Sequence, residues 1–273
     1  MTHSPDVTGA ANQLQGNAVV QGGARVGYAV SGVLHLLIGW IALQVAWSDS
    51  GRSADQSGAL RTLAGTGAGR LTLWAAVVGF FALGLWQIAY GIAARPAEDS
   101  SPWPARAKGF AKAVLYLALA WTCLNTAKGQ PASSKAQSAD FTATLLQHSG
   151  GRLLVALVGL AVVGVGGYHV VKGWTRKFLH DLGDLSGLGE HPARLATRAG
   201  VVGYIAKGIA LAVVGALFVA AAVQNSSSKA TGLDGALRAL RQQAFGPWIL
   251  TAVALGIAAY GVYSVARARY ARL

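Results

Sequence analysis

Two lysines lie inside long apolar stretches of the chain, and they are the first residues to consider for chemistry. Lys207 stands near the start of the apolar run 201–223, and Lys112 has a similar place in the run 110–127. An ionisable side chain inside a membrane span is costly, so it is commonly retained for binding or transport. The alternative is that the aliphatic stem is buried while the ammonium reaches the lipid headgroups. Both interpretations are open: a contact that sets depth, or a site for an anionic lipid or solute.

Two histidines, His35 and His169, also lie within apolar runs. Imidazoles from two different helices can ligate a haem or form a proton path. His169 lies close to the end of its run, whereas His35 lies deeper. We therefore expect ordinary hydrogen bonds between helices and no cofactor.

The polar segment 178–198 contains His180 and Asp184 at a spacing that one metal ion can bridge on a helix. Gly183, Gly187 and Gly189 interrupt such a helix, so we expect a mobile, solvated loop and no metal site. The sequence has no phosphate-binding glycine loop after a strand, no zincin helix and no Ser-His-Asp set. We expect a protein that is not an enzyme.

The composition indicates the environment in which these residues act. Hydrophobic residues make up 53% of the 273 residues and charged residues 12%, whereas soluble domains carry about a quarter charged residues. The formal charge of +13 comes from Lys and Arg at the ends of apolar segments, where phospholipid headgroups lie. We therefore expect membrane lipids as partners and no nucleic acid. The one cysteine, Cys123, excludes an intramolecular disulfide.

Six apolar segments are long enough to cross a hydrocarbon core of about 30 Å as helices. Continuous apolar runs favour helices over barrel strands, which alternate. The fold class predicted is all-α, a polytopic membrane protein with six transmembrane helices. The polar residues 1–24 are expected to form a disordered cytoplasmic tail. The predicted spans are 26–47, 70–93, 110–127, 152–172, 200–223 and 246–266.

The spans repeat. "GYAVSGVLHLLIG" (27–39), "KGFAKAVLYLALA" (108–120) and "GYIAKGIALAVVG" (203–215) align without a gap, at offsets of 81 and 95 residues. Ser31, Lys112 and Lys207 share one position in this alignment. The even spans align at offsets of 82 and 95 residues, with recurring small residues and a following aromatic. Such residues build close helix contacts in membranes, and the glycines predicted to do so are Gly79, Gly84, Gly166, Gly256 and Gly261.

Each repeat is thus a helical hairpin, and two spans per unit give all three hairpins the same orientation. The predicted repeats are 25–95, 106–178 and 198–270. A closed ring with pseudo-threefold symmetry and a linear row are both compatible with the sequence.

The loop inside each hairpin runs from Ser-rich sequence to a short amphipathic stretch. Asp55, Asp140 and Asp234 precede these stretches, as acids do near helix N-termini. We expect a short helix at the membrane surface, with a plain polar loop as the alternative. The leucines expected to face apolar material are Leu60, Leu63, Leu145, Leu146, Leu237 and Leu240.

Lys and Arg flank the spans more heavily on the side of the N-terminus, which favours both termini inside. With the "GY…[KS]G" opening of one span and the "G…G…G-x-[WY]" pattern of the next, the chain resembles a bacterial, largely actinobacterial, membrane family of unknown function with three tandem two-helix units. The resemblance covers about residues 25–270. It implies an integral protein of the bacterial plasma (inner) membrane and supplies no activity.

Two functions remain for such a chain. The first is a non-enzymatic scaffold or accessory subunit that binds lipid and an unidentified membrane protein partner. The second is an ion or small-solute channel or transporter with a pore between the repeats. A conductor lines its path with polar groups, and few mid-span polar residues exist here, which favours the scaffold. Ser31, Lys112 and Lys207 are the candidate headgroup or solute contacts.

Overall fold

The computed structural model describes residues 18–48, 51–93, 103–130, 133–182 and 190–270, and this part of the chain forms helices and turns without a strand. The prediction of an all-α protein with six membrane-spanning helices is confirmed. The candidate spans are Gly27–Trp47, Gly67–Leu85, Gly109–Ala127, Gly151–Trp174, Glu190–Val223 and Gly246–Tyr270.

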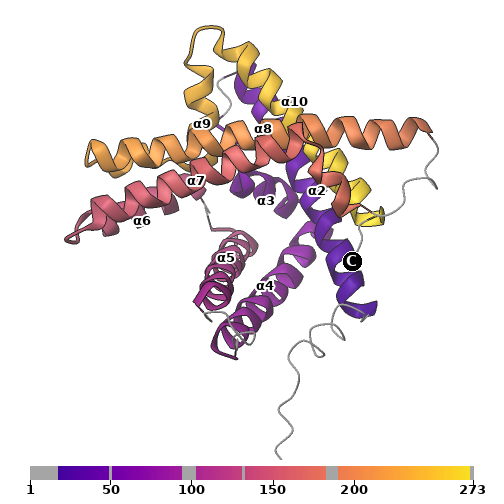
Figure 1. Ribbon diagram of the computed structural model, residues 1–273, viewed down its shortest axis with the longest axis horizontal. Helices are drawn as coiled ribbons and strands as arrows, with labels where there is room; N and C mark the ends of the chain where they lie inside the picture. Colours follow the sequence, from indigo (N-terminus) through magenta and orange to yellow (C-terminus); the bar gives the residue numbers. More distant parts are fainter. Residues whose placement is uncertain (1–17, 49–50, 94–102, 131–132, 183–189, 271–273) are drawn as a thin grey trace, which may run out of the picture. The chain divides into compact units, whose positions relative to one another are not determined.

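The elements follow the repeat (Figure 1). The first repeat contributes α2 (Ala18–Trp47), α3 (Gln56–Ala64) and α4 (Gly67–Ala93), and the second α5 (Trp103–Ala127), α6 (Ser134–Leu146) and α7 (Gly151–Trp174). A short 3-10 helix, η1 (Lys177–Asp181), follows α7. The third repeat contributes α8 (Glu190–Val223), η3 (Ser227–Lys229), α9 (Gly232–Arg241) and α10 (Gly246–Tyr270). Each repeat is therefore a long helix, a short helix and a second long helix.

Several helices extend beyond the predicted spans, and the largest differences are at the starts of α2 and α8. Helix α2 begins at Ala18, so residues 18–24 of the expected tail are helical, and residues 1–17 lie outside the described part. Helix α8 begins at Glu190, ten residues before the predicted span, because a helix continues past the hydrocarbon boundary while hydropathy reports only the apolar part.

The chain divides into two compact units, one formed by residues 1–56 and 134–273 and the other by residues 57–133. In the second unit α4 packs against α5. In the first unit α7 packs against α8, α8 against α10, and α10 against α2 (Figure 1). Apart from the α8 and α10 contact, each of these pairs joins the second span of one repeat to the first span of the next, and α10 returns to α2. The contact of α10 with α2 joins the last span of the chain to the first within the first unit.

Glycines at equivalent positions let the two helices of each pair in the first unit approach closely. A Cβ added at Gly166 of α7 would lie 2.7 Å from the carbonyl oxygen of Gly208 on α8. The equivalent Cβ at Gly261 of α10 would lie 2.8 Å from the carbonyl oxygen of Gly32 on α2. Backbone therefore meets backbone at the same place in both pairs, as small residues permit in membrane helices.

A second contact lies two helical turns away in each pair. A Cβ at Gly215 of α8 would lie 2.6 Å from the carbonyl oxygen of Gly159, and one at Gly39 of α2 would lie 2.8 Å from that of Ala254. Gly215 and Gly39 are equivalent in the repeat, as are Gly159 and Ala254. Two crossing contacts per pair thus fix both the register and the closeness of the helices.

Gly79 differs from the other four glycines predicted to pack. Its added Cβ would meet nothing within 4 Å, whereas Gly84, five residues later, faces Leu117 of α5. Five residues rotate a helix by about 140°, so the two glycines lie on different faces. The position of Gly79 is that of Gly256, which packs on Ala206 where α10 contacts α8 within the third repeat.

Short helices occupy all three hairpin loops, so the plain polar loop is excluded. Each following span begins with a glycine packed closely on a carbonyl near the end of the short helix: Gly69 on Leu63, Gly151 on Leu145 and Gly246 on Arg241. A side chain at these positions would block the turn. The three aspartates were predicted to lie near the N-termini of these short helices. Asp55, directly before α3, and Asp234, in the first turn of α9, do so. Asp140 does not, because it lies in the middle of α6.

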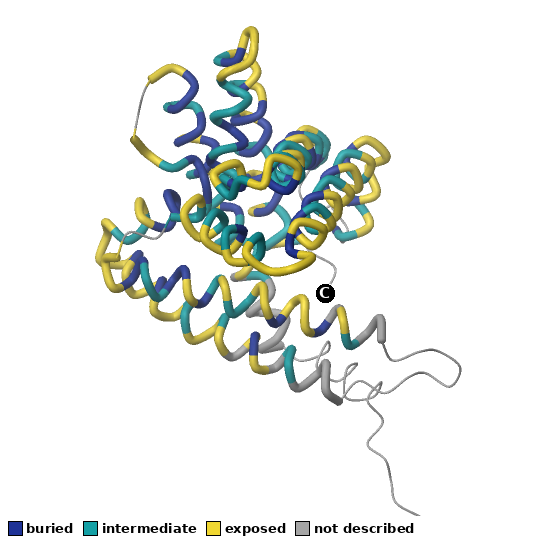
Figure 2. The backbone as a smooth tube through the Cα atoms, turned by 90° about the vertical axis from the view of Figure 1, so that its left-hand side faces the viewer, coloured by how far each residue is buried: buried dark blue, intermediate teal, exposed yellow. Residues whose placement is uncertain are grey.

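Helix α9 packs on protein with its apolar face. It contacts α8, α10 and α6, and Leu237 is fully buried. Asp234 accepts a hydrogen bond from the backbone N–H of Ala54 (2.8 Å) and pairs with Arg238 (3.0 Å), whose guanidinium also donates to the carbonyl of Arg52 (2.8 Å). The loop after α2 is therefore tied to α9. Large apolar side chains remain exposed along the spans, such as Leu71, Leu157 and Leu255, as expected of lipid-facing surfaces. Figure 2 shows that exposed positions recur along the long helices.

Candidate functional site

Four aromatic rings meet in the first unit, and we call them the aromatic cluster: Phe178 of η1, Tyr204 of α8, and Tyr260 and Tyr263 of α10. The Tyr204 ring stacks on Phe178 at 5.3 Å between centroids and meets Tyr260 edge-on at 5.2 Å. Tyr263 meets Phe178 at 5.2 Å, and its hydroxyl donates to the Phe178 carbonyl (3.3 Å). Such pairs stabilise beyond their buried area, so the cluster joins η1, α8 and α10.

The geometry of α8 makes room for this cluster. Gly200 lies directly under the Phe178 ring, where a Cβ would collide with it. Arg176, just before η1, has a left-handed backbone with φ 55°, which turns the chain back towards α8. The turn after α7 is thereby folded onto the bundle. The expectation of a loop over residues 178–198 is wrong for residues 178–181, which belong to η1, and for residues 190–198, which begin α8. Residues 183–189, including Asp184, lie outside the described part of the chain.

Three cations lie over tyrosine rings of the first unit. The ammonium of Lys207 is 4.2 Å from the centroid of Tyr260, and that of Lys172 is 5.3 Å from Tyr204. The guanidinium of Arg267 is 4.3 Å from Tyr28. Cation–π contacts are worth about 0.5–2 kcal/mol, more when desolvated. Lys172 and Arg267 are equivalent in the repeat, as are Tyr204 and Tyr28, so one contact is built twice.

Asp181 connects these two equivalent contacts. Its carboxylate lies 2.7 Å from the ammonium of Lys172 on α7 and 3.7 Å from the guanidinium of Arg267 on α10. The three side chains are between 17% and 26% exposed, so the pairing is partly screened by solvent. Asp181 thus places one negative charge between two positive charges that lie on different helix pairs.

The structure brings four of the predicted residues to the aromatic cluster. Lys207 and His35 both contact the Tyr260 ring, the latter at 4.7 Å, and His169 stacks on Tyr204 at 5.8 Å. Ser31 lies beside His35, with Oγ 3.4 Å from Nδ1. Tyr260 packs beside Gly203, one turn before Lys207 on α8. The Lys207 side chain therefore points back towards the N-terminal end of α8, and its ammonium lies over the face of the Tyr260 ring.

The histidines differ from the prediction in their hydrogen bonds. His35 Nδ1 lies 2.7 Å from the Ser31 carbonyl oxygen, and His169 Nδ1 lies 2.8 Å from that of Val165. Both bonds stay within one helix, because an imidazole on a helix reaches the carbonyl four residues before it. The contacts that these two imidazoles make with other helices are ring contacts, His35 with Tyr260 and His169 with Tyr204, and not the expected hydrogen bonds.

Lys112 belongs to the second unit, where its side chain on α5 is exposed. Within the described ranges no acidic partner or aromatic face contacts it. The repeat position that holds Ser31 and Lys207 beside the aromatic cluster therefore has a different environment in the second unit.

The chemistry available at this site is electrostatic. Three cations and one carboxylate lie close to the aromatic faces of the cluster and of Tyr28. Over the residues that the structure describes, no group of three or more His, Cys, Asp or Glu is arranged to hold a metal ion. Such a set is suited to binding an anion or fixing helices.

Several residues of the cluster were not predicted as site residues. Tyr260 aligns with Val165 and Leu83, and Phe178 and Asp181 lie at or beyond the end of the second repeat, so the alignment does not single them out as site residues. Lys172 and Arg267 do have a signal: they are 95 residues apart, as Gly166 and Gly261 are. A cation conserved between repeats at that offset was available in the sequence.

The fold and site together define a class, the helical membrane proteins built from tandem two-span repeats. The chain belongs to the family described as Domain of Unknown Function (DUF1206), whose pattern matches three times, at residues 26–94, 107–176 and 202–271. These matches confirm the threefold repeat.

A relative is the "Uncharacterized protein YxxB" of Bacillus subtilis (strain 168). It is 28% identical over 248 residues, which cover 90% of this chain and 89% of that protein. No solved structure matches the chain. An alignment of this length reaches into all three repeats of this chain.

Proposed function

We propose that this protein is a non-enzymatic membrane scaffold or accessory subunit that binds lipid and a membrane protein partner. The observation that carries the proposal is the close backbone contact within the helix pairs of the first unit. Gly166 meets Gly208 and Gly261 meets Gly32 with no space for a side chain between them. Pairs closed in this way hold surfaces in fixed positions for other molecules to bind.

The mid-span polar groups support a scaffold over a conductor. The Thr122 hydroxyl donates to the Ala118 carbonyl of its own helix (2.9 Å), and Gln44 accepts from Arg52 (3.1 Å). These groups are satisfied locally, whereas a conduction path presents polar groups to the permeating species.

We further propose a bacterial plasma membrane location with both termini inside. The end of the bundle that carries the N-terminal half of α8 and the C-terminal ends of α7 and α10 holds Lys172, Arg176, Arg194, Arg198 and Arg267. Lys and Arg beside span ends favour the cytoplasmic side. Single cysteines introduced at Thr175 and at Ser228 in a Cys123→Ala chain test this, with a membrane-impermeant maleimide added to intact cells. Labelling at Ser228 alone is expected, and labelling at Thr175 alone would reverse the orientation.

The scaffold proposal is tested by reconstitution and by gentle purification. The purified protein in liposomes is expected to add no ion flux above that of empty liposomes, measured with a potential-sensitive dye. Purification in mild detergent is expected to yield a stoichiometric membrane protein partner. Reproducible ion flux without a partner would overturn the scaffold in favour of a channel.

A further inference from the structure

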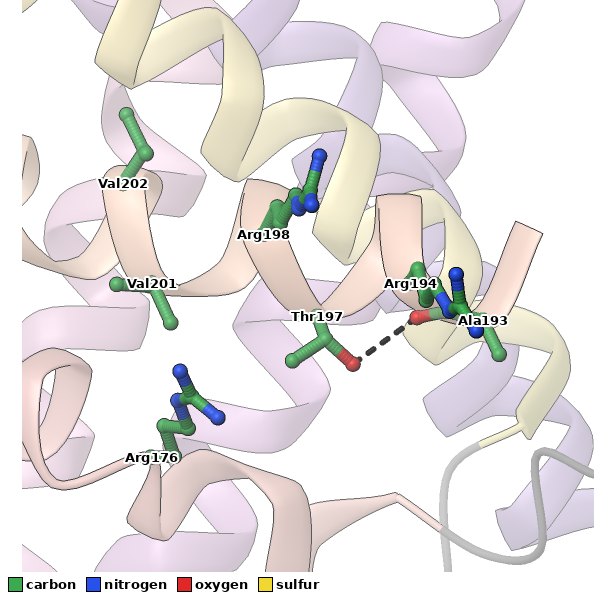
Figure 3. A pocket seen from close by; sticks show the side chains of 7 residues that line it. All are labelled: Arg176, Ala193, Arg194, Thr197, Arg198, Val201 and Val202. Carbon is green, nitrogen blue, oxygen red and sulfur yellow. Dashed lines mark hydrogen bonds between the residues drawn. The ribbon is translucent and has the colours of Figure 1, made fainter. Parts of the chain in front are cut away.

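We propose that a pocket beside α8 binds the phosphate of an anionic phospholipid. The pocket has a volume of about 500 Å³. Arg176 approaches it from the turn after α7, and Arg194 and Arg198 belong to α8 itself (Figure 3). Ala193, Thr197, Val201 and Val202 complete the lining. This inference rests on the proposed lipid-binding scaffold and identifies the lipid class and the residues.

The pocket has one charged end and one apolar end along α8. Gly173, in the last turn of α7, packs beside Val201, so Val201 and Val202 are level with the end of the α7 span. Arg198 and Arg194 lie one and two turns further out on the same helix. Hydrocarbon is expected at the valines and headgroups at the arginines. A phospholipid has this same order of apolar chain and charged phosphate.

The guanidinium groups in the pocket are differently engaged. Arg194 pairs with Glu190 at 2.8 Å, and both side chains are largely exposed. Arg176 and Arg198 have no acidic partner within the described ranges. Thr197 does not supply a further free donor, because its hydroxyl bonds to the Ala193 carbonyl (2.9 Å). Two arginines therefore leave an uncompensated positive charge in an apolar pocket, and guanidinium groups bind phosphate oxygens in a bidentate manner.

Arg176 is the most informative of these residues. Its φ of 55° lies in the left-handed region, where glycine and asparagine are favoured and an arginine costs about 1 kcal/mol. Arginine is therefore not the residue that this backbone conformation favours. Its side chain faces the pocket (Figure 3), which gives a reason for arginine in binding rather than in folding.

The test measures lipid binding to the full-length protein, delipidated in detergent, by native mass spectrometry. The ligands are phosphatidylglycerol, phosphatidylcholine and inorganic phosphate. The test variant is Arg176→Gly/Arg198→Gln, and the control is Arg269→Gln, which removes a charge at the same end of the bundle outside the pocket. We expect wild type to prefer phosphatidylglycerol over phosphatidylcholine by at least about tenfold. The test variant should lose about tenfold in phosphatidylglycerol affinity, as expected for lost bonds to a charged group, and the control should change less than twofold.

The other outcomes each overturn a stated part. If wild type prefers phosphatidylglycerol and the test variant binds it equally well, the pocket is wrong while the lipid-binding scaffold stands. If wild type shows no preference, the lipid part of the proposed function fails with it. If inorganic phosphate displaces the lipid at equal affinity, the site takes free phosphate. Should the double variant misfold, Arg176→Gly alone decides, because glycine suits that backbone, and a loss of about threefold is expected.

Discussion

The two units of this protein contain the same kind of helix pair, built with different residues. In the first unit the pair of α7 and α8 has glycine at four crossing positions: Gly159, Gly166, Gly208 and Gly215. The α10 and α2 pair has three glycines and Ala254. The equivalent positions of α4 and α5 in the second unit are Val77, Gly84, Ala113 and Ala120. One glycine remains there, and it faces the Leu117 side chain rather than a carbonyl.

The cation–π contact follows the same division. Lys172 with Tyr204 and Arg267 with Tyr28 are equivalent contacts of the first unit, whereas the second unit has Tyr90 and Gly109 at these positions. The repeat therefore preserves which helices pair and lets the residues at the contact vary. The close backbone contacts and the paired cation–π contacts belong to the first unit, which also contains the pocket proposed to bind lipid.

The largest expected effect is at Tyr260, whose ring contacts Lys207, His35, Tyr204 and Tyr263. Replacing Tyr260 by Ala should lower the free energy of unfolding by about 3 kcal/mol, because the cavity would open among buried rings. The equivalent residue of the second unit is Leu83, which is 43% exposed, and Leu83→Ala should change it by less than about 0.5 kcal/mol. Thermal unfolding in detergent measures both. Equal losses would show that the aromatic cluster stabilises the protein no more than the equivalent position of the second unit does.

The next effect is at the glycine crossing. Gly166→Val should destabilise by about 2–3 kcal/mol, since the added carbons meet the Gly208 carbonyl and the Ala212 backbone, which cannot move independently. Gly164, two residues before on the same helix, has open space around it, so Gly164→Val is the matched control and should be almost silent. The same unfolding measurement applies. A silent Gly166→Val would contradict the backbone contact.

The second unit should tolerate the same change better. A Cβ at Gly84 meets the tip of Leu117, 2.7 Å from Cδ2, while the Leu117 backbone nitrogen is 3.6 Å away. A flexible side chain can shift, so Gly84→Val should destabilise by about 1 kcal/mol, less than Gly166→Val. If Gly84→Val were the more harmful of the two, the contrast between the units would be reversed.

The smallest effect concerns Asp181, the carboxylate between Lys172 and Arg267. Asp181→Asn should destabilise by about 1 kcal/mol, discounted for the exposure of the three side chains. Glu190→Gln removes an exposed ion pair with Arg194 and should cost less than about 0.5 kcal/mol. Chemical denaturation of the two variants side by side measures the difference, and equal values would indicate that Asp181 does not link the helix pairs.

The fold was largely readable from the sequence because long apolar runs and a threefold repeat each leave a strong signal. Six spans and three equivalent hairpins follow from residue type and offset alone. The extension of α8 to Glu190 did not, since Arg194 and Arg198 end the apolar run without ending the helix. The open surroundings of Gly79 could not be predicted either, because a repeat alignment gives position in sequence and not the face that a neighbour covers.

The site was readable only in part. Lys207 and the histidines were identified because charge and imidazole are unusual in apolar runs. Their convergence on Tyr204 and Tyr260 depends on α8 packing against α10, a contact between distant segments that no local pattern specifies. The pocket around Arg176 was also hidden, since it depends on a left-handed residue that glycine would normally signal.

The packing of α10 of the last repeat on α2 of the first is tested most directly by cross-linking. Trp47 of α2 donates to the Thr251 hydroxyl of α10 at 3.0 Å, so Trp47→Cys with Thr251→Cys in a Cys123→Ala chain should be joined by a short bis-maleimide in native membranes. Arg269, about 27 Å further along α10 than Thr251, supplies the control pair with Trp47→Cys. Intact mass should show one intramolecular bridge for the first pair and two separately modified thiols for the control. Separate modification of both thiols in the first pair would contradict the closure of the third repeat onto the first.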